Sequence, residues 1–232
     1  MRIGLALISI LAAGAAAWPA AGQVRGDPAA VAAAERLLAE AGGRDAWSSR
    51  TFYAEERAYL MSGEVAELRI WRDFATLSRR IENVTPSRRI VEWTTPKGGW
   101  VSRDGQVRRL DPVELAGEVQ GLRQEPYAIY HRLARRDPAL RAELRNDGAR
   151  LVVFDAEERV LCWFDLDRRG ALAGWGNHWQ GNLNQHFYGP TADMGDANLP
   201  RFGVNNTGTF RFEYRLARLS PQPPPAPEHP AE

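Results

Sequence analysis

The chain has 232 residues, of which 44% are hydrophobic and 25% are charged, and its 30 Lys+Arg and 29 Asp+Glu give a formal charge of +1. This composition is that of a globular domain long enough to fill a core, which excludes disorder of the whole chain. The near-zero charge lacks the basic excess that attracts nucleic acid or an acidic membrane surface, so we expect neither partner.

Residues 1–22 have the three parts of a secretory signal peptide. Arg2 supplies the positive start, residues 3–17 are an apolar stretch, and small residues follow for the peptidase. The stretch is shorter than the ~20 residues that a membrane-spanning helix needs. The single cysteine, Cys162, lies far from the cleavage region and has no partner for a disulfide. We therefore expect a soluble, monomeric periplasmic protein without an N-terminal lipid anchor.

One helix followed by strands is predicted for the first half of the mature chain. Asp27-Pro28 is a typical helix start, and the Ala- and Leu-rich residues after it lead to a Gly-Gly stop. Residues 51–60 alternate so that Phe52 and Leu60 share one face, which we expect to point inward. Asp104-Gly105 predicts a hairpin turn. Strands are predicted at residues 51–60, 65–71, 75–84, 88–94, 100–102 and 106–110.

Two helices and then further strands are predicted for the second half. Asp111-Pro112 begins the first helix, at residues 113–122, and residues 125–136 form the second. Residues 181–206 are typical of long loops around one short strand, and residues 220–232 are proline-rich and expected to be disordered or extended. Strands are predicted at residues 140–145, 151–154, 160–164, 171–175, 185–188 and 209–219.

Together these elements predict an α+β fold. A single curved antiparallel sheet of about 10–11 strands, an incomplete barrel, is expected to close over a few short helices. No linker divides the chain, so we expect residues 23–219 to form one domain between the signal peptide and the proline-rich tail.

Four short segments occur in an order that resembles that of a known superfamily. They are the helix ending Ala39–Trp47, the pair Lys97–Trp100 and Asp104-Gly105, the turn Phe164–Asp167 before Gly170, and Asn198-Leu199-Pro200 before the last strand. With the export signal, this order is similar to that of the periplasmic lipoprotein carriers and related lipid-binding proteins, the LolA, LppX and RseB-like fold. The resemblance covers residues 27–219 and is carried by the order of the segments, since none of them is specific alone.

The resemblance implies a cavity between sheet and helices that holds acyl chains of a lipid or lipoprotein. Each buried CH₂ group contributes about 0.8 kcal/mol, so one chain barely offsets the ~4–15 kcal/mol cost of association, and two or three hold well. The alternative is that the same side chains fill a solid core. The candidate lining residues are Phe52, Leu60, Leu68, Ile70, Leu77, Ile81, Phe210, Phe212 and Tyr214.

Arg72 and Arg79 are the candidate lid-locking residues. In the carriers, an arginine after the second strand, usually followed by proline, holds the lid helices closed through hydrogen bonds to their backbone. Arg72 falls at that place but is followed by Asp73, and Arg79 lies between Leu77 and Ile81 as a second candidate. A guanidinium offers five donors, so it can satisfy several acceptors at a buried edge. The alternative is a surface arginine paired with Asp73.

Residues that could carry catalysis or bind metal form no known motif. His178 and His186 flank a loop, but their spacing matches no metal site, so we expect no metal or other cofactor. Asp165 and Asp167 lie beside arginines, which is typical of a solvated turn and not of an acid–base pair. We therefore do not expect an enzyme.

Three functional hypotheses remain, in order of preference. The first is a carrier that shields acyl chains, and the sequence leaves open whether a membrane-bound handover protein receives the cargo. The second is a sensor or interaction domain of the same fold, and the third is a hydrolase that uses the aspartates or histidines named above. Trp175 and Trp179 additionally leave open a sugar-stacking site, against a role as core and rim aromatics.

Overall fold

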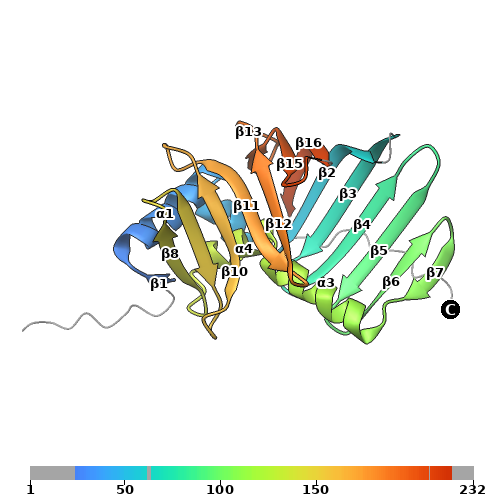
Figure 1. Cartoon of the computed structure of the whole chain (residues 1–232), viewed down its shortest axis with the longest axis horizontal. Coiled ribbons are helices and arrows are strands. Elements are labelled where there is room, and N and C mark those ends of the chain that lie inside the picture. The colour runs from blue at the N-terminus through green and yellow to red at the C-terminus, as the bar shows by residue number, and fades with distance from the viewer. Residues whose placement is uncertain (1–23, 62–63, 209, 221–232) are drawn as a thin grey trace, which may run out of the picture.

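The computed structural model describes residues 24–61, 64–208 and 210–220 (Figure 1). The expected signal peptide at 1–22 and residues 221–232 of the expected tail lie outside the described residues, whereas Ser220 is the last residue of the final strand. The described part holds a 14-stranded sheet, a separate 2-stranded sheet and four helices. The structure is thus α+β, as predicted, with a large curved sheet that does not close into a barrel.

The long sheet has the order β1-β8-β9-β10-β11-β12-β15-β16-β2-β3-β4-β5-β6-β7. Its neighbours are antiparallel except for β1 and β8. We call β2–β7 the first arm and β8–β12 the second arm; β15 and β16 join them (Figure 1). The strands are β1 (Arg25–Gly26), β2 (Phe52–Met61), β3 (Glu64–Asp73), β4 (Ser78–Val84), β5 (Arg89–Thr95), β6 (Gly98–Arg103), β7 (Gln106–Arg109), β8 (Arg141–Arg145), β9 (Arg150–Phe154), β10 (Val160–Leu166), β11 (Leu172–Trp179), β12 (Asn182–Tyr188), β13 (Thr191–Asp193), β14 (Asn198–Pro200), β15 (Phe202–Asn205) and β16 (Arg211–Ser220).

The predicted helix starts are confirmed by their caps. The Asp27 side chain accepts a hydrogen bond from the Ala30 N–H at 2.7 Å. Asp111 and Glu114 form a reciprocal capping box, in which each side chain accepts from the other residue's backbone N–H. Glu125 is both the C-cap residue of α3 and the N-cap residue of α4. The helices are α1 (Pro28–Glu40), α2 (Arg44–Ser49), α3 (Pro112–Gln124) and α4 (Pro126–Ala134).

The helices cover the two arms differently. α1 packs against β8 and β9, and α4 packs against α1 and α2. α3 instead contacts β5 of the first arm and both β10 and β11 of the second, so it lies across the space between the arms (Figure 1). None of the helices in the described part is long and apolar enough to span a membrane.

β2 turns the opposite face inward from the one predicted. Tyr53, Glu55 and Tyr59 are buried, whereas Leu60 is 53% exposed. The prediction ranked the two faces by hydrophobicity and was wrong because polar groups are buried readily when they are satisfied. Here the Tyr53 hydroxyl donates to Glu55 Oε2 at 2.7 Å, and arginines neutralise the carboxylate.

Two further segments differ from the prediction. Leu77 has a φ of 53° and lies in the turn between β3 and β4, so the strand begins at Ser78 and not at residue 75. Residues 181–206 contain β12, β13, β14 and β15, where one short strand was expected. Paired strands in this segment therefore raise the strand count above the predicted number.

Candidate functional site

A cleft of about 390 Å³ lies beneath α3, between the inner faces of the two arms. Side chains of β2–β5 form one side, those of β11 and β12 form the other, and the α3–α4 junction forms the roof. The first-arm side is mainly charged, and the second-arm side carries indole, amide and imidazole groups. This cleft is the candidate functional site because its volume falls in the range of about 300–1,000 Å³ that small-molecule sites occupy.

The register of the first arm brings its charged side chains to the cleft. Ile70 of β3 pairs with Ile81 of β4, and Ile81 pairs with Glu92 of β5. Arg72, which lies two residues after Ile70 on β3, pairs with Arg79 of β4. Directly paired residues share a face of a sheet, so both rows point inward.

Salt bridges connect this inner face to the roof. Arg79 donates from Nη1 to Glu125 Oε1 and from Nη2 to Glu118 Oε2, both at 2.6 Å, and Arg72 donates from Nε to Glu125 Oε2. Glu125 therefore receives two guanidinium groups at the point where α3 meets α4. The whole series of charges, here called the ion network, runs Arg57–Glu55–Arg72–Glu125–Arg79–Glu118.

The deepest part of the ion network is centred on Glu55, whose side chain is 0% exposed. Glu55 Oε1 accepts from Arg57 Nη2 at 2.6 Å and from Arg72 Nη1 at 3.0 Å. Arg57 Nη2 also donates to the Tyr127 hydroxyl at 3.2 Å. Because each buried charge depends on its partners for compensation, removal of one member leaves the others uncompensated at a cost of about 3–5 kcal/mol.

The buried carboxylates of the ion network are held in the ionised form. Burial by itself raises the pKa of Glu55, but Arg57 and Arg72 outweigh it and bring that pKa below its usual value. The same holds for Glu125. Burial raises its pKa, but Arg72 and Arg79 outweigh burial, so the pKa lies below its usual value.

Glu92 differs from the carboxylates of the ion network. Burial raises the pKa of Glu92, and the opposing effect of Arg79 is too weak to reverse the shift. No hydrogen bond or ion pair of its side chain occurs among the described residues. Its carboxyl group is thus the part of the charged side that a ligand can bind without displacing a salt bridge.

The second-arm side of the cleft offers neutral hydrogen-bonding groups. Asn177 is 2% exposed and donates from Nδ2 to Gln124 Oε1 at 3.1 Å, while its buried Oδ1 has no hydrogen-bond partner in the described part of the chain. Burial, assisted by Arg57, lowers the pKa of His186 to about 4, so its imidazole is neutral at neutral pH. Asn184, which pairs with Asn177, also faces the cleft.

The roof sits close to the second arm because α3 presents glycines there. The Trp179 Nε1 donates to the Gly117 carbonyl at 2.9 Å. A Cβ atom at Gly121 would lie 3.0 Å from the same indole nitrogen, and one at Gly117 would lie 2.2 Å from the Gln180 side chain. A larger residue at Gly121 would therefore crowd the Trp179 indole, whereas one at Gly117 would require the exposed Gln180 side chain to move.

A second hollow of about 290 Å³ continues the cleft on the other side of α3. Glu92, Glu118 and Trp179 line both hollows, so these three side chains form the passage between them. Arg103 and Arg108 line its outer part, where Arg108 forms two hydrogen bonds with Glu114. Charged side chains therefore line the open space beneath α3 along its length, opposite or beside aromatic ones.

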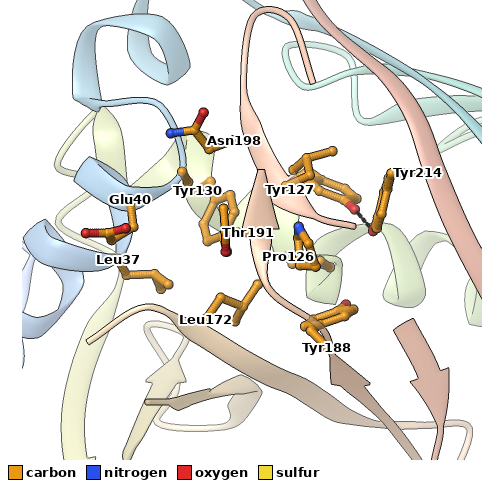
Figure 2. Close-up of a pocket in the computed structure, with 13 residues that line it drawn as sticks. Leu37, Glu40, Pro126, Tyr127, Tyr130, Leu172, Tyr188, Thr191, Asn198 and Tyr214 are labelled. Atoms are coloured by element: carbon orange, nitrogen blue, oxygen red, sulfur yellow. Dashed lines mark hydrogen bonds between the residues drawn. The ribbon is translucent and has the colours of Figure 1, made fainter. Parts of the chain in front are cut away.

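The apolar space between α1, α4 and the second arm is nearly filled. Figure 2 shows the pocket there, where Leu37 and Leu172 lie on one side and Tyr127 and Tyr214 join hydroxyls on the other. Its volume is about 10 Å³, about the space of a single water. At this place the alternative of a solid core is the better description.

The nine predicted cavity residues are spread over several environments. Ile70 lines the cleft, and Tyr214 lines the small pocket of Figure 2. Leu60 is on the outside, and Leu77 is in a turn, for the reasons given above. The remaining five line none of the three hollows described here: Leu68 and Phe212 are buried in the core, and Phe52, Ile81 and Phe210 are partly buried.

Arg72 and Arg79, the predicted lid-locking residues, both reach the helices. Arg72 is 5% exposed, so the alternative of a surface arginine paired with Asp73 is wrong. Their acceptors are the carboxylates of Glu125 and Glu118, where the resemblance implied backbone carbonyls.

The other candidates for chemistry do not gather in the cleft. Asp165 accepts from Arg150 Nε at 2.6 Å, and Asp167 accepts backbone N–H groups of its own turn. His178 is exposed on β11, and burial raises the pKa of the Cys162 thiol. The described residues hold no group of three or more His, Cys, Asp or Glu that could bind a metal ion.

Both tryptophans considered for sugar stacking line the cleft, although Trp175 is only 4% exposed.

Sequence reasoning missed the carboxylates and the amide that define the cleft. Glu55 was assigned to the outer face, and Glu92, Glu118, Glu125 and Asn177 were not singled out. One signal was available: Tyr53, Glu55, Arg57 and Tyr59 alternate on one face of β2, and two tyrosines flanking an acid–base pair indicate a buried polar face.

The cleft has room for a small molecule and offers both polar and aromatic side chains to it. Comparison with protein-family models finds no match to this chain, and comparison with curated proteins finds none either.

Proposed function

We propose that this protein is a non-enzymatic binding and carrier protein for an amphiphilic ligand, a lipid or the acylated end of a lipoprotein. The observation that supports it is the cleft of about 390 Å³ beneath α3, with charged groups on one side and Trp175, Trp179 and Tyr188 on the other. In this proposal the polar head contacts Glu92 and Asn177, and an acyl chain lies along the aromatic side chains.

The volume beneath α3 limits how much cargo fits while the ion network holds α3 and α4 against the first arm. Because the space between α1, α4 and the second arm is about 10 Å³, an acyl chain has to be placed beneath α3. The cleft falls near the lower end of the small-molecule range, so it accommodates one chain or part of one. A larger cargo requires α3 and α4 to move away from the first arm.

The ion network supplies the closure in this proposal. Opening breaks the contacts of Arg72 with Glu125 and those of Arg79 with Glu125 and Glu118. Side chains that leave these bonds become hydrated, which offsets part of the loss. Export to the periplasm, which residues 1–22 predict, belongs to the same proposal.

A filled-cleft variant tests the proposal. Asn184 faces the cleft, while its neighbour Leu183 is 49% exposed on the other face of β12, so Asn184→Trp fills the space and Leu183→Trp is its matched control. Binding of a dansyl-labelled undecanoic acid is measured by its fluorescence. We expect N184W to weaken binding by at least about tenfold, corresponding to 1.4 kcal/mol, and L183W to leave it unchanged.

Two results would contradict the proposal. One is the absence of any saturable binding by the wild-type chain, together with no lipid in native mass spectra of protein isolated from the periplasm. The other is an equal effect of the two tryptophan variants, which would place the bound fatty acid outside the cleft.

A further inference from the structure

Three polar side chains of the cleft are open to its space and form no hydrogen bond within the described part of the chain. Asn184 and His186 lie two residues apart on the inner face of β12, and Glu92 lies on the opposite side, on β5. Their polar atoms are not among the fully enclosed ones, in contrast to Nε1 of Trp175. A molecule in the cleft can therefore form hydrogen bonds with all three.

The indole of Trp179 adds an apolar surface beside these groups. Its Nε1 donates to the Gly117 carbonyl at 2.9 Å, which fixes the half-buried ring, and the ring lines both hollows beneath α3. Trp179 pairs with Asn182, two residues before Asn184, so Trp179 and Asn184 are diagonal neighbours about 7–8 Å apart. A flat ring that lies over the indole is thus within reach of the amide.

The charges around the cleft do not favour an anionic ligand. Arg57, Arg72 and Arg79 each form a salt bridge with a carboxylate of the ion network, so an anion would have to compete with a carboxylate that is already held. In the second hollow the carboxylates outnumber the guanidinium groups by three to two. A phosphate or carboxylate group is therefore poorly matched to either space.

A cationic ligand is not favoured either, although Glu92 has no ion-pair partner. Arg79, Arg103 and Arg108 all attract the Glu92 carboxylate, and Glu118 repels it. An ammonium group at Glu92 would meet the same three guanidinium groups, and their repulsion offsets much of the attraction. The remaining class is a neutral ligand with several hydrogen-bonding groups.

Hydroxyl groups fit the side chains that are open. A hydroxyl both donates and accepts, an ionised carboxylate such as that of Glu92 only accepts, and the Asn184 amide and the neutral His186 imidazole each offer a donor and an acceptor. The C–H face of a sugar ring is apolar and packs on an aromatic ring, for which Trp179 provides the surface. A sugar therefore satisfies the polar and the apolar groups together.

We propose that the cleft binds a neutral sugar ring, stacked on the Trp179 indole between Glu92 of the first arm and Asn184 of the second. His186, the next inward-facing residue of β12, forms a hydrogen bond with a further hydroxyl. Where the sugar is the head of a glycolipid, this inference rests on the proposed carrier function and names its head group. A free saccharide would make the same contacts, so the experiment has to separate the two sources.

Four ligands with matched parts test the inference by isothermal titration calorimetry of the full chain. They are octyl β-D-glucoside, octanoate and octyltrimethylammonium, each below its micelle-forming concentration, and methyl β-D-glucoside. We expect octyl glucoside to bind at least about tenfold more tightly than octanoate and the ammonium compound. Weaker binding of methyl glucoside supports a glycolipid, whereas equal binding supports a free saccharide and contradicts the carrier function alone.

Variants at the two contacts locate the bound sugar. Glu92→Leu removes the acceptor and should weaken octyl glucoside binding by about tenfold, and Asn184→Ala should weaken it by about fivefold. Glu213→Leu is the matched control and should leave the affinity unchanged, because its carboxylate is 59% exposed on β16 and lines neither hollow.

Three results would overturn the inference. The first is binding of octanoate or octyltrimethylammonium as tightly as octyl glucoside, which would leave the carrier function standing with a charged head group. The second is wild-type affinity for octyl glucoside in both E92L and N184A. The third is the absence of binding by all four ligands, which would count against the carrier function as well.

Discussion

The part of the second arm beside α1 and α4 is packed with apolar side chains, whereas the inner face of the first arm carries the ion network. Leu151, Val153 and Phe164 are 0% exposed, and the space left beside α1 and α4 is about 10 Å³. Between the two arms, beneath α3, about 390 Å³ is open although Glu55 and Arg72 of the first arm are only 2% and 5% exposed.

The difference between the arms has a physical origin. Apolar side chains have no orientation to satisfy, so they interdigitate until voids disappear. Charged side chains hold fixed positions because each needs its partner at hydrogen-bond distance, and open space remains beside them. The larger hollow of the described part therefore occurs where charged side chains form one side of it, and not where the hydrophobic pattern is strongest.

The largest change in the free energy of unfolding is expected for a substitution in the packed part of the second arm. Phe164→Ala removes a fully buried ring stacked 5.4 Å from Tyr130 and should lower the free energy of unfolding by about 3–5 kcal/mol. Urea denaturation measures the change, with the exposed Phe187→Ala as the control that should stay near wild type. A cost below about 1 kcal/mol for F164A would mean that this arm is not tightly packed.

A slightly smaller change in the free energy of unfolding is expected for a substitution in the ion network of the first arm. Glu55→Gln keeps the volume of the side chain but leaves Arg57 and Arg72 without their shared carboxylate, so the free energy of unfolding should fall by about 3 kcal/mol. Because the folded-state pKa of Glu55 is lowered, its stabilisation is complete above its usual value of 4.5 and is lost as the pH falls through the lower, folded-state value. Wild type and E55Q should therefore converge in acid, and a gap that stays constant down to low pH would contradict the ionised network.

The smallest of the three expected changes in stability comes from the protonation of His186. Its pKa of about 4 lies below the usual 6.5, so the unfolded chain binds a proton before the folded chain does, and stability falls as the pH drops from 6.5 towards 4. His186→Gln should remove about 2 kcal/mol of this pH dependence between pH 7 and pH 5. Urea denaturation at several pH values in this window, paired with NMR titration of the imidazole, measures it. An NMR midpoint near 6.5 would show that the ring is solvated.

Much of the fold follows from local sequence signals. Asp27-Pro28 and Asp111-Pro112 begin helices as predicted, and Asp104 and Gly105 both have positive φ, as a type I′ hairpin turn requires. The face of β2 could not be predicted from hydrophobicity, because Glu55 is buried only by virtue of arginines and tyrosines on other strands and helices. The pairing of segments within 181–206 likewise depends on partners that the local sequence does not reveal.

The candidate site was predictable only in part. Arg72 was singled out by the resemblance to the lipoprotein carriers, and Arg79 by its position between Leu77 and Ile81. Their partner Glu125 lies 53 and 46 residues away and looks like an ordinary helix-boundary residue. The hollow beneath α3 depends on Gly117 and Gly121 facing Trp179, a tertiary fit that neither segment contains alone.

Glu125 stands at the junction of two helices, and both of its carboxylate oxygens are bonded to the first arm. A helix free to swing by itself would allow the roof to yield gradually, one end after the other. Glu125 instead ties the end of α3 and the beginning of α4 to the first arm together, and Glu118 holds α3 to Arg79 as well. In the proposed carrier the two helices would therefore move together, and substitutions at Glu125 would change how often the roof opens more than how far it opens.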